Sequence, residues 1–233
     1  MATAAIPTDP RSPTTPAAAL AADDPAARTI TSDPLVLGFA LLAVGAVTLG
    51  LQLVGFVAQA SLGSPLAILF AGTGLGLFVA TAWAARLESR PTSGPWTTGT
   101  TLPITYLALL AAFFTSYAAL VLGLTHGWFG VAAADVKDTV ATFQLTWLVG
   151  FALVAIATAR LPRIIPALTA GFALALALLL IGTLAPSEAA NTIAGIVVLA
   201  VGLGAAYVFL SLSSAATGGP EHPLGAPLIG GEQ

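Results

Sequence analysis

The chain has 233 residues, of which 57% are hydrophobic and only 7% are charged, and its net charge is −3. A soluble domain carries about 25% charged residues, so this composition cannot build a soluble surface. The few cations form no basic stripe, which excludes nucleic-acid binding. Cysteine is absent, which excludes disulfides, thiolate metal ligands and cysteine nucleophiles.

The first 33 residues differ in composition from the rest of the chain. They hold five prolines, many alanines and threonines, and no apolar periodicity. Such segments do not bury enough apolar surface to fold. A positively charged stretch followed by an apolar run is also missing, which argues against a secretory signal peptide. We therefore predict a disordered cytoplasmic tail over residues 1–33.

Six apolar segments follow, and none of them contains Asp, Glu, Lys or Arg. Each has about 20 residues, the length of helix that crosses a hydrocarbon core of about 30 Å. Strands of a membrane barrel would be about ten residues long with alternating polarity. The segments predict an all-α polytopic membrane protein whose six-helix bundle occupies residues 34–213. The predicted spans are 35–57, 65–85, 102–124, 140–159, 164–184 and 192–212.

The cations indicate a topology. Lys and Arg accumulate in the cytoplasmic loops of membrane proteins. Six of the seven fall before the first span or after the second and fourth spans, and one falls in a loop on the other side. We expect a multi-pass protein of the cell membrane, inner or plasma, with both termini cytoplasmic and residues 214–233 as a cytoplasmic tail. The six are Arg11, Arg28, Arg86, Arg90, Arg160 and Arg163, and the exception is Lys137.

The predicted spans contain hydroxyls and amides but no ionisable acid, base or cation, which leaves no side chains for a buried proton relay. His126 and His222 are isolated, and two such histidines cannot form a bis-His haem site or a three-ligand zinc site. An embedded Ser/His pair is missing as well. The sequence therefore predicts neither an enzyme nor a metal or cofactor site.

An uncharged interior restricts what could cross it. A carboxylate entering hydrocarbon is costly, and no Lys or Arg is placed there to compensate its charge. Two solutions remain, which are a narrow hydroxyl-lined pore and passage with a proton as the neutral acid. Both imply a small solute.

Small residues mark possible helix contacts. Gly72 and Gly76 form a GxxxG pair in the second span, and residues 194, 198, 202 and 206 form a stripe of mostly small residues in the sixth. Such spacings let helix backbones approach closely. In a chain this rich in Gly and Ala they also arise by chance, and both interpretations stay open.

Five local motifs occur in order along this frame. Residues 33–40 read Asp-Pro-Leu-Val-Leu-Gly-Phe-Ala, Thr105-Tyr106 opens the third span, and Trp147 precedes Thr158 and Arg160 in the fourth. Residues 202–207 read Gly-Leu-Gly-Ala-Ala-Tyr, and residues 223–225 read Pro-Leu-Gly. From about residue 33 to 230 the chain resembles the acetate uptake transporter family, also called succinate-acetate permeases.

The resemblance implies a homo-hexamer in which each protomer carries its own carboxylate path through a constriction of Phe, Tyr and Leu. The matching positions are Phe39 and Tyr106, with Phe172 or Leu168 from the fifth span. Further polar or small positions expected along the path are Thr105, Gln144, Thr169, Ala205 and Tyr207.

We therefore expect transport of acetate or another short-chain monocarboxylate, with succinate as a further candidate, through a channel or a proton-coupled permease in the lipid bilayer. The alternative is a non-transporting membrane scaffold or assembly protein. Polar side chains facing a path would favour transport. Hydroxyls that all point into helix contacts would favour the scaffold.

Overall fold

The computed structural model describes residues 33–58, 61–87, 101–220 and 222–229. Asp33 and the residues after it form one unit. The N-terminal stretch that we predicted to be disordered lies outside the described residues except for Asp33. Three of the cations behind the predicted topology, Arg11, Arg28 and Arg90, lie outside them too.

The described residues contain helices and no named strand, only an isolated bridge between Pro162 and Pro227. Six helices are long and apolar enough to cross a membrane, which confirms the predicted all-α class and the number of spans. The elements are α2 (Pro34–Leu53), α3 (Gly63–Ala67), the π-helix η3 (Ile68–Leu75), α4 (Gly76–Leu87), α5 (Thr101–His126), the 3₁₀-helix η4 (Ala133–Asp135), α6 (Val136–Ala157), α7 (Ile164–Leu184) and α8 (Glu188–Ala216).

Helix ends differ from the hydropathy boundaries for local reasons. The sixth span was predicted over 192–212, but α8 has 29 residues and begins at Glu188. The side chain of Ser187 accepts a hydrogen bond from the Ala190 N–H at 3.3 Å and caps this extra turn. At about 1.5 Å per residue, α8 is longer than a hydrocarbon core is thick, so its polar ends extend beyond the apolar region.

The start of α2 is fixed by a cap and a proline. The Asp33 carboxylate accepts a hydrogen bond from the Leu35 N–H at 2.8 Å, and Pro34 occupies the first turn, where no backbone donor is lost. Burial raises the pKa of the Asp33 carboxyl above its ordinary value, and the Leu35 N–H partly offsets that rise. The folded state therefore holds this proton more tightly than the unfolded chain does.

This raised pKa predicts a pH effect. The protonated Asp33 side chain stabilises the folded state relative to the charged one. This stability should be lost as the pH rises from the ordinary pKa of aspartate through the raised pKa of Asp33 in the folded state. Asp33→Asn keeps the cap without a charge, so it should be more stable than wild type near neutral pH and equal to it in acid. Asp33→Ala loses the cap and should be less stable by about 1 kcal/mol. Thermal unfolding in detergent from about pH 4 to about pH 8 measures these differences. A constant difference between Asp33→Asn and wild type over this range would contradict the prediction.

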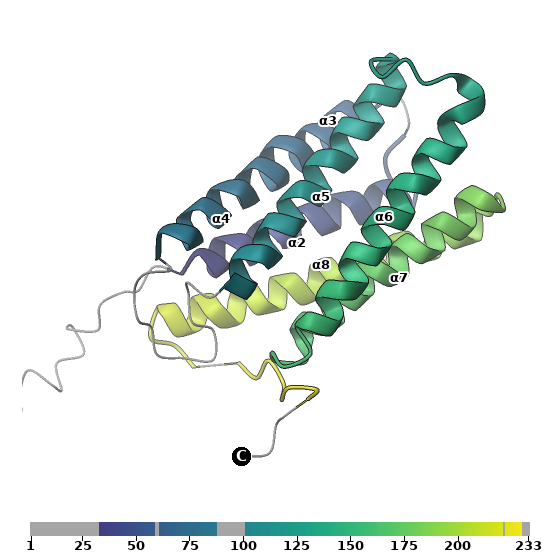
Figure 1. Ribbon diagram of the computed structural model, residues 1–233. Helices are drawn as coiled ribbons and strands as arrows, with labels where there is room; N and C mark the ends of the chain where they lie inside the picture. Colours follow the sequence, from purple (N-terminus) through teal and green to yellow (C-terminus); the bar gives the residue numbers. More distant parts are fainter. Residues whose placement is uncertain (1–32, 59–60, 88–100, 221, 230–233) are drawn as a thin grey trace, which may run out of the picture. The chain divides into compact units, whose positions relative to one another are not determined.

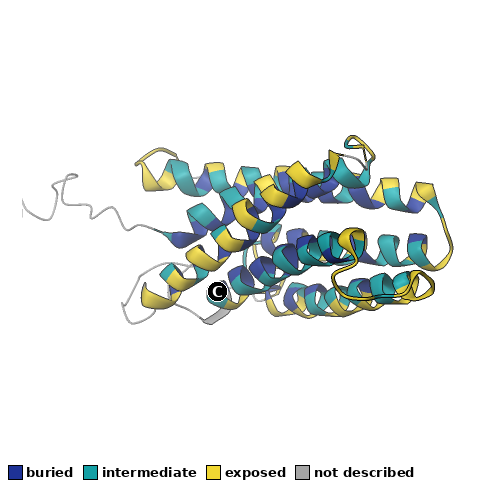
Figure 2. Cartoon of the chain, turned by 90° about the horizontal axis from the view of Figure 1, so that it is seen from above, coloured by how far each residue is buried: buried dark blue, intermediate teal, exposed yellow. Residues whose placement is uncertain are grey.

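The helices pack in a fixed order of neighbours. Helix α8 lies between α2 and α7, α6 packs against α7, and α5 packs against η3 and α4, as Figure 1 shows. The buried faces of the helices turn toward these neighbours, and the exposed residues gather on the outer faces and at the helix ends (Figure 2). Helices α5 and α6 have little backbone contact. Their shared space is filled by aromatic side chains, described below.

The contact between α2 and α8 is the most extensive of these, and the two backbones approach closely. A Cβ atom placed on Gly195 would lie 2.7 Å from Val54 Cγ1 and 2.9 Å from the backbone nitrogen of Val54. One placed on Gly202 would lie 3.0 Å from the backbone nitrogen of Val47. Ala194 and Val198 are buried on the same helix. The small-residue stripe of the sixth span is therefore a packing face for α2.

The GxxxG pair of the second span behaves differently. A Cβ atom on Gly76 would lie 2.8 Å from Leu41 Cδ1, so Gly76 packs against α2. A Cβ atom on Gly72 would meet nothing closer than 3.8 Å, and that atom belongs to Ile68 of the same span. Within the described chain, only one member of the pair makes a helix contact.

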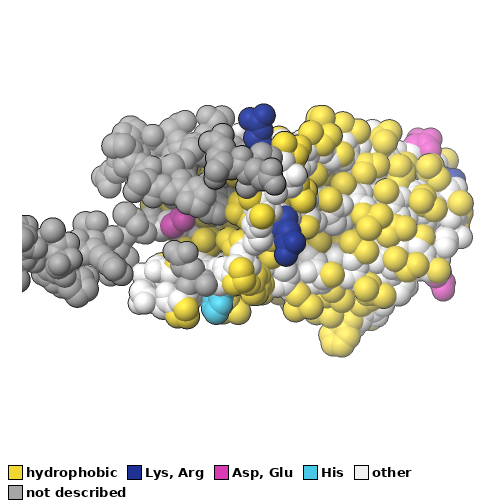
Figure 3. Space-filling view, turned by 90° about the horizontal axis from the view of Figure 1, so that it is seen from below, with side chains coloured by type: hydrophobic (Ala, Val, Ile, Leu, Met, Phe, Trp, Pro, Cys, Tyr) yellow, Lys and Arg dark blue, Asp and Glu magenta, His cyan; other side chains and the backbone are white. Residues whose placement is uncertain are grey.

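Hydrophobic side chains cover most of the described surface in Figure 3. Arg86, Arg160 and Arg163 lie at the end of the bundle where α2 begins and α8 ends. Lys137 lies at the opposite end, where its Nζ donates a hydrogen bond to the Leu184 carbonyl at 3.0 Å. The described cations are therefore divided as predicted, and which end faces the cytoplasm stays a prediction.

Residues 222–229, here called the C-terminal strap, lie across the turn between α6 and α7. The strap is held by main-chain hydrogen bonds from Arg163 N–H to the Ala226 carbonyl (3.3 Å), from Ile164 N–H to Leu224 (3.4 Å) and from Leu228 N–H to Ala159 (3.1 Å). The expected C-terminal tail therefore includes a segment fixed to the bundle.

Candidate functional site

Two of the predicted constriction residues meet inside the bundle. Phe39 on α2 and Tyr106 on α5 are both buried, and their ring centroids are 6.1 Å apart with planes inclined at 35°. The Tyr106 hydroxyl has no hydrogen-bond partner although it is buried. A buried hydroxyl without a partner costs about 1–3 kcal/mol. Such an atom therefore calls for an explanation.

The two candidates for the third constriction residue lie one turn apart on α7. Leu168 packs against α8 at Gly204, where a Cβ atom would lie 2.7 Å from Leu168 Cδ2. Phe172 stacks on Phe151 with ring centroids 4.9 Å apart. Both side chains are buried. In the part of the chain that the structure describes, no ring contact joins Phe172 to Phe39 or Tyr106, so the choice between Leu168 and Phe172 stays a prediction.

An aromatic cluster fills the space between α5, α6 and α7. Phe113 is its centre, with ring centroids 5.1 Å from Phe151, 5.4 Å from Trp147 and 5.7 Å from Phe172. We did not predict this cluster from the sequence. The signal that could have found it is the i, i+4, i+8 spacing of Phe143, Trp147 and Phe151, which places all three on one face of α6.

A cavity of about 170 Å³ lies beside this cluster, bounded by α2, α5, α6 and α7. Most of its lining is apolar, including Leu49 and Leu176, but Tyr117 and Gln144 also line it. Gln144 is buried, and its Oε1 has no hydrogen-bond partner. The predicted polar residue Gln144 therefore faces an internal cavity.

Gln52 and Tyr117 form a further polar pair, and neither residue was predicted to lie on the path. Gln52 Nε2 donates a hydrogen bond to the Tyr117 hydroxyl at 3.2 Å, and Gln52 Oε1 is buried without a partner. The two residues come from α2 and α5, 65 positions apart in the sequence. Only the folded bundle brings them together, and of the two Tyr117 lines the cavity.

The remaining predicted polar positions are arranged differently. Thr169 is buried, and its hydroxyl donates to the backbone carbonyls of Ile165 (3.2 Å) and Pro166 (3.0 Å). Ala205 is fully buried, and Thr105 is exposed. Tyr207 is partly exposed, and its hydroxyl donates to the Pro223 carbonyl in the strap at 2.9 Å. Thr169 and Tyr207 thus use their hydroxyls within the protein.

A second unpaired hydroxyl lies in the π-helix. Thr73 is fully buried on η3, and its Oγ1 has no partner. Its side chain faces Gly45 of α2, where a Cβ atom would lie 2.8 Å from Thr73 Oγ1 and 3.1 Å from Phe114 Cε1. π-helical turns occur frequently at functional sites. The hydropathy of the second span gave no sign of this turn.

The chemistry of this interior is polar and uncharged. The buried polar side chains among the described residues are Thr73, Gln144, Thr158, Thr169 and Ser211. Within the same residues, no three His, Asp or Glu side chains gather where they could hold a metal ion. The unpaired amide oxygens of Gln52 and Gln144 can accept hydrogen bonds, and the Tyr106 hydroxyl can donate or accept one. The arrangement can therefore bind a small polar molecule without compensating a full charge.

These features define a class, a six-helix membrane protein with an uncharged polar interior. A solved structure of similar fold is described as "Structure of the bacterial acetate channel SatP", with a TM-score of 0.69 and 21% sequence identity over 83% of this chain and 99% of that one. Neither a family model nor a curated protein sequence matches the chain. At this identity the likeness shows the fold, and it confirms at that level the predicted resemblance to the acetate uptake transporter family.

Proposed function

We propose that the protein is a divergent member of the acetate uptake transporter family that carries acetate or another short-chain monocarboxylate across the cell membrane. The observation that carries this proposal is the set of unpaired polar atoms inside an uncharged bundle, above all the Tyr106 hydroxyl beside Phe39. The shared fold with a bacterial acetate channel supports it. No catalytic role is proposed.

The proposed path has two polar stations in each protomer. One is the cavity with Gln144 and Tyr117, and the other is the Phe39–Tyr106 pair. Tyr106 and Tyr117 are eleven residues apart on α5, so the stations are separated by about 16 Å along the helix. The aromatic cluster around Phe113 lies between them in sequence and forms an apolar neck, which can close a path by excluding water.

The cavity favours a small solute with at most one carboxyl group. Its volume of about 170 Å³ suits a short monocarboxylate. Succinate would bring a second carboxylate, and an uncompensated charge in an apolar environment is very costly. We therefore expect acetate and its near homologues to be carried faster than succinate.

The unpaired amide oxygens of Gln52 and Gln144 bear on the coupling to protons. An acceptor is matched by a donor, and a carboxylic acid has an O–H donor only when it is protonated. Passage as the neutral acid also avoids burying a charge. We propose that acetate crosses together with a proton, which predicts faster uptake when the outside is more acidic.

Orientation and assembly complete the proposal. Arg86, Arg160 and Arg163 at one end of the bundle support a cytoplasmic location for both termini. The family resemblance supports a hexamer with one path in each subunit. The mass of the purified protein in detergent tests the assembly, and protease access in sealed vesicles tests the orientation.

The experiment that tests the function is competition for uptake. Proteoliposomes are given labelled acetate together with an excess of unlabelled formate, propionate or succinate. We expect formate and propionate to reduce the labelled uptake strongly and succinate to reduce it weakly. Equal competition by all three would contradict the proposed size and charge selection. Absence of protein-dependent uptake would favour the membrane scaffold.

Gln144→Leu tests the cavity station. It removes the unpaired amide and keeps a side chain of similar size, so we expect acetate uptake to fall about two- to tenfold, the value of one hydrogen bond. Thr146→Val is the matched control, because Thr146 lies two residues away and its exposed hydroxyl is bonded to the Thr142 carbonyl. Equal uptake by both variants would remove Gln144 from the path.

A further inference from the structure

A second hollow lies away from the candidate path, where α6 ends and α7 begins. It has a volume of about 830 Å³, and its wall on one side is the C-terminal strap. Helix α6 contributes Ala155 and Ile156, α7 contributes Ala167 and Ala170, and the strap contributes apolar residues that include Leu228. We call it the strap groove. It is far larger than the internal cavity, and its lining is almost wholly apolar.

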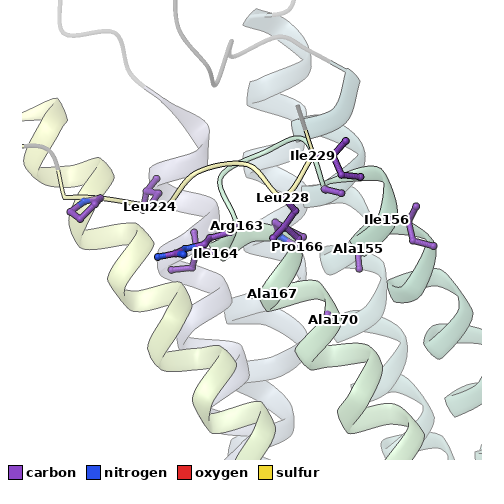
Figure 4. Close-up of a pocket in the computed structure, with 13 residues that line it drawn as sticks. Ala155, Ile156, Arg163, Ile164, Pro166, Ala167, Ala170, Leu224, Leu228 and Ile229 are labelled. Carbon is purple, nitrogen blue, oxygen red and sulfur yellow. The ribbon is translucent and has the colours of Figure 1, made fainter. Parts of the chain in front are cut away.

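One cation belongs to the lining of the strap groove. The Arg163 side chain lies against Gly225, whose φ of +85° is in the left-handed region and whose missing Cβ leaves room for the arginine. Figure 4 shows Arg163 toward one end of the lining side chains, with Ile156 and Ile229 at the other end. The groove therefore combines a long apolar surface with a positive charge at one end.

This charge is not neutralised by a described acid. Within the residues that the structure describes, no ion pair joins Arg160 or Arg163 to a carboxylate, and both arginines are exposed. The acids Asp135, Asp138 and Glu188 belong to the opposite end of the bundle, and Asp33 caps α2. The backbone donors at the start of α7 are used by the strap. An anion at this end would therefore be held by the guanidinium groups.

The groove also opens on an exposed apolar face, which the predicted spans would place against the membrane. Ile156, Leu228 and Ile229, which line it, are 73%, 63% and 60% exposed. Ile156 lies near the end of a candidate span, and the strap follows the last candidate span, which ends at Ala216. We therefore expect the groove to lie at the boundary between hydrocarbon and headgroups. Basic pockets between membrane helices at this depth bind anionic lipid headgroups.

We infer that the strap groove binds an anionic glycerophospholipid, with an acyl chain along the alanines of α6 and α7 and the phosphate at Arg163. Charge complementarity selects this occupant over a neutral lipid, and the apolar length of the groove selects it over a free anion. A bound lipid would join the strap to the bundle at the membrane boundary. The inference does not depend on what the protein transports.

The test compares two lipids with identical acyl chains, phosphatidylglycerol and phosphatidylcholine, added to the full chain purified in detergent. Native mass spectrometry measures the lipid retained. We expect wild-type protein to bind phosphatidylglycerol at least about fivefold more tightly than phosphatidylcholine. We expect Arg163→Gln to lower the affinity for phosphatidylglycerol about fivefold. Arg86→Gln is the control, because Arg86 is an exposed cation at the same end of the bundle outside the groove.

The apolar part is tested by filling it. Ala167→Trp and, as a milder change, Ala170→Leu should each reduce phosphatidylglycerol retention severalfold, whereas Ala200→Trp on the exposed face of α8 should not. Equal retention of the two lipids, or unchanged retention in both groove variants, would overturn the inference. Displacement of the lipid by glycerol phosphate alone would also overturn the inference, because the apolar groove would then add nothing to binding. A groove variant that changes the number of subunits in lipid-free detergent would overturn it as well, because the groove would then be a contact between subunits.

Discussion

Tyr106→Phe is expected to lower acetate uptake by about two- to tenfold while leaving the protein at least as stable as wild type. The Tyr106 hydroxyl is buried without a partner, so its removal breaks no hydrogen bond and relieves a desolvation cost of about 1–3 kcal/mol. A hydrogen bond to a neutral carboxylic acid contributes about 0.5–1.5 kcal/mol, which corresponds to about a two- to tenfold loss of rate. Uptake by proteoliposomes and thermal unfolding in detergent measure the two quantities.

Tyr207→Phe is the matched control, for which we expect lower stability and unchanged uptake. Its hydroxyl is already bonded to the Pro223 carbonyl, so its loss should lower stability by about 1 kcal/mol and leave the rate of uptake per folded protein unchanged. If Tyr106→Phe transports at the wild-type rate, the hydroxyl is not part of the path. If Tyr106→Phe is instead clearly less stable than wild type, the hydroxyl has a structural partner and is not free to bind a solute.

The second large effect is expected from replacing glycine by alanine. The substitution should destabilise the protein at Gly195 but not at Gly72. Alanine normally stabilises a helix relative to glycine by up to about 1 kcal/mol. At Gly195 the added methyl would lie 2.9 Å from the backbone nitrogen of Val54, so α2 and α8 must separate. Overpacking of this kind costs about 1–3 kcal/mol. We expect Gly195→Ala to lower the thermal midpoint.

Gly72→Ala is the matched control, since its methyl would meet no atom closer than 3.8 Å. It should leave the thermal midpoint unchanged or raise it slightly. A similar decrease in both variants would indicate that the methyl at Gly72 disturbs a contact between subunits. In that case the close approach of α2 and α8 would not be the determinant of stability.

The fold was largely predictable because its determinants are local. A run of about 20 uncharged apolar residues can satisfy its backbone in a membrane only as a helix, so counting such runs gave the class and the six spans. Helix ends were less predictable, because Ser187 extends α8 beyond its apolar run through a cap that hydropathy does not register. The π-turn at η3 was missed for a related reason, since its composition is that of an ordinary apolar helix.

The candidate site was predictable only where a motif carried it. Phe39 and Tyr106 were assigned by resemblance, and the structure brings their rings together. The Gln52–Tyr117 pair depends on packing between α2 and α5, which no spacing within one segment encodes. Tyr207 was predicted to lie on the path, but in the structure its hydroxyl donates to the Pro223 carbonyl of the strap. This partner could not be predicted from the sequence, because the strap reaches Tyr207 only in the folded protein.

The measurement that tests the central claim most directly is the initial rate of labelled acetate uptake into sealed proteoliposomes, compared with empty vesicles of the same lipid. The proposed path predicts protein-dependent uptake that is faster when the outside is more acidic than the inside. It also predicts that Tyr106→Phe lowers this uptake by about two- to tenfold. Uptake equal to that of empty vesicles at every imposed pH gradient, from protein shown to be folded, would contradict the proposal.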